Sequence, residues 1–152
     1  MGFFDGYNVA TSGMSAQRAR INVVSSNIAN AQTTQTLDGG PYKKQNVVFQ
    51  EVLIDENNKR TAVKNSGLNK SDPMSLRGVG IQEIIDSKDK PIKKYEPNHP
   101  DADKDGYVAY PNINPVVEMV DLMEAMRSYE ANLSSFKTQK DMDTKTIEII
   151  KS

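Results

Sequence analysis

The sequence of 152 residues predicts an α+β protein, with long N- and C-terminal helices and a small β-rich insert between them. Apolar side chains recur at spacings of three and four residues near each end of the chain, which is the heptad pattern of paired helices. Between residues 35 and 113 this pattern gives way to short runs of β-branched and aromatic residues. We therefore expect segment 1–34 to pair with segment 114–152 as an antiparallel coiled coil, and residues 35–113 to form a central domain.

The N-terminal helix is expected over about residues 8 to 31. Asp5 or Asn8 suits its cap, and Thr33-Thr34 followed by Gly39-Gly40-Pro41 disfavours its continuation. Gln17 is the one polar member of its predicted seam, which comprises Ala10, Met14, Gln17, Ile21, Val24, Ile28 and Ala31.

The C-terminal helix is expected to begin near Pro115, because proline suits the first turn of a helix. About 35 residues at 1.5 Å each give a length of roughly 50 Å. Lys140 and Asp143 interrupt its seam. The seam comprises Met119, Leu122, Met126, Tyr129, Leu133, Phe136, Lys140, Asp143, Ile147 and Ile150.

Four segments of the insert have the composition of strands, namely 46–54, 78–86, 91–95 and 106–110. Residues 55–77 are polar and contain Gly, Pro and Asn, so we expect a long exposed loop or a partly ordered insertion there.

The start of the C-terminal helix carries more apolar residues than one partner helix can bury. They are Val116, Val117, Met119, Val120, Leu122, Met123 and Met126. Either the insert folds back over this surplus, or other copies of the chain cover it.

The composition argues against most enzymes and against nucleic-acid binding. The net charge is −1 with a pI near 5.9, and there is no cysteine. His99 is the single histidine, Gly78-x-Gly80 lacks the third glycine of a dinucleotide site, and no G-x-S-x-G elbow occurs. No segment reaches the length of a signal peptide core or a membrane span. We expect no catalytic residue, cofactor or metal, and no insertion into a membrane.

One stretch resembles the opening of a calcium-binding loop: Asp101, Asp103 and Asp105 followed by Gly106. The twelfth position is Asn112 instead of a bidentate carboxylate, and prolines precede the loop where a helix is required. An Asp-rich turn ahead of the strand at 106–110 explains the same residues. We expect the turn, and a calcium-dependent binding module is the alternative.

The run SGMSAQRARINVVSSNIANAQTT, residues 12–34, resembles the N-terminal motif shared by bacterial flagellar rod and hook proteins. The runs GGPYKKQNVVFQ, YEPNHPDADKDGYVAYPNIN and NPVVEMVDLMEAMRSYEANLSSFKTQKDM are similar to the same family and follow in its order. Residues 55–77 carry none of its motifs.

The resemblance implies a structural subunit of the flagellar basal body. Such proteins are exported through the flagellar type III apparatus without cleavage and form the proximal rod, a tubular drive shaft in the periplasm. Their terminal helices pack with those of neighbouring subunits into an inner tube, and the middle of the chain forms an outer layer. Expected partners are copies of the chain, other rod proteins, the export apparatus, and the inner-membrane ring and rod-adaptor proteins at the rod base.

Overall fold

The computed structural model describes residues 5–54, 60–62 and 77–151. Its elements follow one another as α1 (Asp5–Ala29), β1 (Gln45–Ile54), β2 (Arg60–Ala62), β3 (Arg77–Asp86), β4 (Ile92–Tyr95), β5 (Tyr107–Tyr110) and α2 (Pro115–Lys151). Two terminal helices thus flank a small antiparallel β insert in the sequence, which confirms the predicted α+β class.

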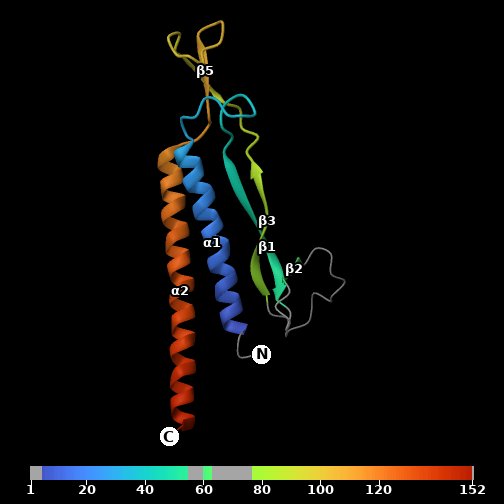
Figure 1. The fold of residues 1–152 in the computed structure, drawn as a ribbon, viewed down its shortest axis with the longest axis vertical. Helices are drawn as coiled ribbons and strands as arrows, with labels where there is room; N and C mark the ends of the chain where they lie inside the picture. The colour runs from blue at the N-terminus through green and yellow to red at the C-terminus, as the bar shows by residue number, and fades with distance from the viewer. Residues whose placement is uncertain (1–4, 55–59, 63–76, 152) are drawn as a thin grey trace.

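The two helices lie side by side and run in opposite directions (Figure 1). Tyr7 near the start of α1 contacts Asp143 of α2, whereas Asn27 near the end of α1 contacts Glu118 in the first turns of α2. The sheet of β1 and β3 lies on the side of α1 away from α2, so α1 is the middle layer (Figure 1).

Both helix boundaries lie close to those expected. α1 covers Asp5–Ala29 instead of 8 to 31, and Ala31 closes a tighter turn by donating to the carbonyl oxygen of Ile28 at 3.3 Å. Asn114 caps α2, because its Oδ1 accepts the Val116 N–H at 3.0 Å. The 37 residues of α2 give a length of roughly 55 Å. Within the described ranges, no helix is apolar over the length that a bilayer crossing requires.

The four predicted strands are present, and β1 pairs antiparallel with β3 from Gln45↔Asp86 to Leu53↔Arg77. Of the two alternatives for residues 55–77, a continuous loop is wrong, because Arg60–Ala62 form β2 on the other edge of β1 and Arg77 already belongs to β3. Strand pairing there uses main-chain groups, which need no apolar side chains. The remainder of that range lies outside the described residues.

α1 rests directly on β3 through two small residues. A Cβ atom added to Gly78 would lie 2.7 Å from Ser12 Oγ, so a larger residue at this position would have to displace the Ser12 side chain. Ser12 is fully buried; its hydroxyl donates to the Val9 carbonyl oxygen at 2.7 Å and accepts the Val79 N–H at 3.2 Å. The sheet is therefore held against the helix by a buried polar contact as well as by packing.

β4 and β5 form a separate two-stranded hairpin, with Ile92 opposite Tyr110 and Tyr95 opposite Tyr107. The hairpin projects beyond the helix pair, at the end where α2 begins (Figure 1). Only a thin apolar core is fully enclosed by the described residues, and its members are Ala16, Val23, Val24, Val52, Val108 and Ala125.

Candidate assembly surfaces

α1 buries two lines of residues, because it lies between α2 and the sheet. Val24 of the predicted seam is buried, and the other six members, Ala10, Met14, Gln17, Ile21, Ile28 and Ala31, are partly buried. The remaining buried residues of α1 are Ser12, Ala16, Val23 and Asn27, which lie outside that seam. A heptad pattern detects one face of a helix, so the second line was missed.

On α2, several residues that face α1 lie one position before a member of the predicted seam. Leu122, Tyr129, Leu133 and Phe136 are partly buried, but Met119 and Met126 are 51% and 47% exposed. Four residues that face α1 and lie outside the predicted seam recur every seven positions, namely Glu118, Ala125, Asn132 and Gln139. Met119 and Met126 are therefore less enclosed than Glu118 and Ala125, which precede them and which a search for a continuous apolar seam passes over. The role of Met119 and Met126 in assembly stays a prediction.

The helices approach closely where α1 carries glycine. A Cβ atom at Gly13 would lie 2.9 Å from Asn132 Nδ2, and one at Gly6 would lie 3.4 Å from Gln139 Oε1. Glycine on α1 thus leaves room for the longer amide side chains of α2.

One end of the helix pair is closed by Tyr7. Its hydroxyl donates to Asp143 Oδ2 at 2.6 Å, and its ring meets Phe136 edge-on at a centroid distance of 5.0 Å. The hydrogen bond to Asp143, followed by burial, raises the pKa of Tyr7 to about 12. Asp143 interrupts the apolar seam of α2 in the sequence, and in the folded chain it accepts the hydrogen bond from Tyr7 of α1.

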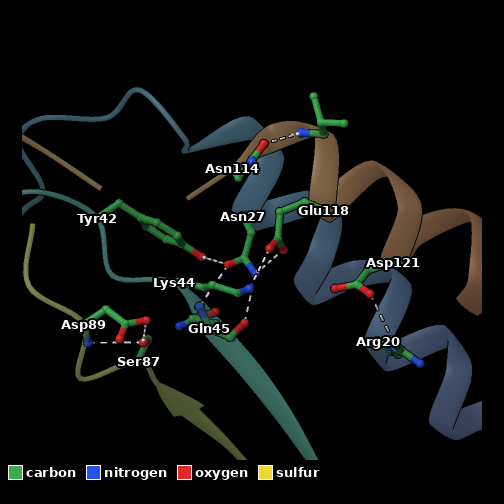
Figure 2. A network of polar contacts seen from close by, with 11 residues as sticks. Arg20, Asn27, Tyr42, Lys44, Gln45, Ser87, Asp89, Asn114, Glu118 and Asp121 are labelled. Atoms are coloured by element: carbon green, nitrogen blue, oxygen red, sulfur yellow. Dashed lines mark hydrogen bonds and ion pairs between the residues drawn. The ribbon is translucent and has the colours of Figure 1, made fainter. Parts of the chain in front are cut away.

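The other end is closed by a polar cluster that joins both helices to the insert, which we call the Asn27–Glu118 cluster (Figure 2). Asn27 donates to Glu118 Oε2 at 3.0 Å and to the Gln45 carbonyl oxygen at 2.9 Å. Its Oδ1 accepts the Gln45 N–H at 2.9 Å and the Tyr42 hydroxyl at 3.1 Å. Lys44 pairs with Glu118 Oε1 at 2.7 Å.

The cluster is deeply enclosed, since Asn27 and Glu118 are only 1% exposed. It was not predicted from the sequence, although one signal was present: Glu118 is a charged residue between the apolar pairs Val116-Val117 and Met119-Val120. The partner of Glu118, Lys44, comes from the chain just before β1, which no local pattern could connect to it.

The surplus apolar residues of α2 are exposed in the folded chain. Val116, Val117, Met119, Val120, Met123 and Met126 are each between 47% and 68% exposed, and we call them the outer face of α2. The alternative in which the insert folds back over this surface is therefore wrong. Leu122, the seventh member of the predicted surplus, is partly buried.

The Asp-rich stretch forms the turn between β4 and β5. Asp103 Oδ1 accepts the N–H groups of Asp105 and Tyr107 at 3.0 and 2.9 Å, and Gly106 has φ +80°, which favours glycine. Asp101 Oδ2 accepts the Thr34 hydroxyl at 2.7 Å. Among the residues described, no three His, Cys, Asp or Glu side chains converge in the manner of a metal site.

His99 is a loop residue beside this turn. Its Nδ1 accepts the Asp101 N–H at 3.1 Å. A nitrogen that accepts this bond carries no proton, so the 3.9 Å separation between Nδ1 and Asp101 Oδ2 is not an ion pair.

Comparison with known proteins gives two matches to family models. Residues 8–34 match the flagella basal body rod protein model, and residues 104–149 match the flagellar basal body rod FlgEFG protein C-terminal model. The flagellar basal-body rod protein FlgC of Borreliella burgdorferi is 41% identical over 99% of both chains. The FlgC protein of Aquifex aeolicus is 39% identical over 97% of both chains. That of Escherichia coli is 37% identical over 93% of this chain and 92% of the relative.

The chain belongs to the FlgC family of flagellar basal-body rod proteins. The two family-model matches cover most of α1 and the segment from the β4–β5 turn through nearly all of α2. They therefore include most of the helix pair, the outer face of α2 and Gly106. The strands β1 to β3 lie between the two family-model matches. In that segment the similarity to FlgC proteins comes from the nearly full-length alignment with relatives.

Proposed function

We propose that the chain is a structural subunit of the flagellar basal-body rod. In this proposal α1 and α2 pair as an antiparallel coiled coil and pack against the helices of neighbouring subunits, which are copies of the chain and other rod proteins. The family membership supports assembly into the rod, because the relatives at 37% to 41% identity are named flagellar basal-body rod proteins.

The observation that carries the proposal is the outer face of α2. Its apolar side chains lie in about three successive turns and are about half exposed, although a contiguous apolar surface favours burial by another protein. Because α1 occupies the opposite side of α2 and the insert lies beyond α1, a neighbouring subunit is the occupant that we propose.

A second apolar region lies at the far end of α2. Met142, Ile147 and Ile150 are 53%, 49% and 78% exposed, and this part of the helix extends past the described start of α1 (Figure 1). An assembly that stacks helices end to end along an axis would cover both regions, whereas a side-by-side dimer would cover one.

The finer parts of the proposal concern place and partners. We propose that the rod is the proximal rod, that it transmits motor torque in the periplasm, and that the insert forms its outer layer. Export by the flagellar type III apparatus without a cleaved signal peptide, and contacts with the inner-membrane ring and rod-adaptor proteins, belong to the same proposal. No observation favours the calcium-dependent alternative, because Asp103 Oδ1 is already used by two backbone N–H groups.

The proposal is tested by deleting the gene and purifying basal bodies from the deletion strain. We expect no rod and no swimming, with both restored by an epitope-tagged copy whose tag is located in the rod by immunogold labelling. Complete rods in the deletion strain, or a tag located outside the basal body, would refute the assignment.

A further inference from the structure

The β4–β5 hairpin has one covered face and one exposed face. Residues opposite each other on paired strands share a face, so Lys94 and Val108 lie on one side and Tyr95 and Tyr107 on the other. Val108 is fully buried, whereas Tyr95 and Tyr107 are 66% and 43% exposed. Their rings meet edge-on at a centroid distance of 5.3 Å. Lys93 alternates with Lys94 and so lies beside these rings, and we call Lys93, Tyr95 and Tyr107 the tyrosine face.

The position of the hairpin suggests that the tyrosine face is a contact surface. Within the described part of the chain no third strand pairs with β4 or β5, and the hairpin projects beyond the helix pair (Figure 1). A two-stranded hairpin alone is only marginally stable in water, and exposed tyrosine is enriched at protein interfaces. The side chain of Lys93 is 69% exposed and has only a long contact of 4.0 Å to Asp103. The tyrosine face therefore offers aromatic rings with a positive charge at their edge.

The opposite end of the molecule carries a helix end of matching chemistry. α2 extends past the described start of α1 (Figure 1). Asp143 faces Tyr7 of α1, and Ile147 and Ile150 follow on the same side of α2, four and seven residues later. Ile147 and Ile150 are 49% and 78% exposed, and Glu148 is an exposed carboxylate beside them.

Stacking subunits end to end would bring these two surfaces together. The hairpin reaches beyond one end of the helix pair, and the end of α2 reaches past α1 at the other. A subunit placed on the hairpin end would thus set the exposed side of its own C-terminal helix beside the hairpin. Isoleucine side chains would pack on the tyrosine rings, and the carboxylate would meet Lys93 at the rim.

We propose that the tyrosine face binds the C-terminal helix end of a different rod protein stacked on this chain. Residues 104–149 match the C-terminal model of FlgEFG rod proteins, which indicates that such proteins carry a helix end like that of α2. If the hairpin bound the helix end of a second copy instead, two different surfaces of one chain would join, and such a contact gives an open-ended filament of a single protein. The inference rests on the proposed rod function and names one contact within it.

The test is photo-crosslinking inside the assembled rod. A photoreactive aromatic residue, p-benzoylphenylalanine, replaces Tyr95 in one strain and Lys94, on the covered face, in a control strain. Each strain carries the substituted gene as its only copy; basal bodies are purified and irradiated, and the linked peptides are identified by mass spectrometry. The probe at Tyr95 should link to the last turns of the C-terminal helix of a different rod protein, and the probe at Lys94 should not yield that peptide.

A second arm tests the charge at the rim. Lys93→Glu sets a carboxylate against the acidic side of the helix end, so it should lower the yield of the Tyr95 crosslink by roughly 10-fold. Lys104→Glu makes the same change of charge at an exposed position in the β4–β5 turn and is the matched control. It should leave the yield unchanged.

Three results would overturn the contact in rods that contain the chain. They are the absence of any linked protein, a link to another part of a rod protein or to a protein outside the rod, and a link to a second copy of this chain. Each would leave the rod function standing, because the chain would already be located in the rod. Equal yields from Lys93→Glu and Lys104→Glu would equally contradict the charge complementarity, whereas absence of the chain from basal bodies would refute the rod function and the contact with it.

Discussion

Gly13 of α1 faces Asn132 of α2 so closely that a Cβ atom at position 13 would lie 2.9 Å from Asn132 Nδ2. Alanine is favoured over glycine within a helix by about 1 kcal/mol, so Gly13→Ala would stabilise an isolated α1. In the helix pair it must displace Asn132, and overpacking costs about 1–3 kcal/mol. We therefore expect Gly13→Ala to lower the free energy of unfolding, measured by urea denaturation.

Gly6→Ala provides the matched control, because its new Cβ atom would meet Gln139 at the ordinary contact distance of 3.4 Å. It should leave the stability unchanged or raise it. Adding Asn132→Ala to Gly13→Ala should recover the loss. If Gly13→Ala raised the unfolding free energy as much as Gly6→Ala, the helices would not be packed as closely as described.

The pKa of Tyr7, raised from 10.0 to about 12 chiefly by its hydrogen bond to Asp143, predicts a pH dependence. Because folding favours the protonated phenol, this contact stabilises the fold fully below pH 10, and the contribution is lost as the pH rises toward 12. Asp143→Ala should lower the pKa of Tyr7, followed by NMR of ¹³C-labelled tyrosine. Asp141→Ala should have a smaller effect, because Asp141 acts only through its charge. Equal shifts in both variants would contradict the hydrogen bond.

Gln17 has a buried Oε1 with no hydrogen-bond partner among the described residues. An unsatisfied buried polar atom costs about 1–3 kcal/mol, so Gln17→Leu should raise the free energy of unfolding of the isolated chain. A polar seam residue can fix the register between helices, and we therefore expect the same variant to permit misassembled oligomers. Electron microscopy of rods from cells that carry Gln17→Leu checks the second effect. Correct rods and normal swimming would leave Gln17 without a role in register.

The β4–β5 turn depends on one carboxylate. Asp103→Ala removes the acceptor of two backbone N–H groups and should lower the free energy of unfolding by about 1 kcal/mol, measured by urea denaturation. Asp105→Ala is the control, since Asp105 takes part in this turn through its N–H. Calorimetric titration should show no calcium binding at micromolar concentration, where a sensor loop would bind. Saturable micromolar binding would revive the calcium alternative.

The sequence was sufficient to predict the helices and four of the strands, because each has a local periodicity. It failed on the contact between the helices, where Glu118, Asn132 and Gln139 are polar and depend on the space left by glycine in α1. It failed on β2 for a related reason, since Arg60–Ala62 pair through the main chain without an apolar pattern. Lys44 and Glu118 meet only in the folded chain, so their pairing could not be predicted from local sequence, although Glu118 stands out as a charged residue among apolar ones.

The central claim is that the outer face of α2 is covered by neighbouring rod subunits. Met123 suits the test because its side chain is 51% exposed, so a substitution there should leave the folded chain intact. Met123→Leu keeps the surface apolar and is the control. Cells whose only copy carries Met123→Asp should make and export the chain but build no rod and fail to swim, whereas Met123→Leu cells should swim. Normal rods and swimming with Met123→Asp would show that this face is not the assembly surface.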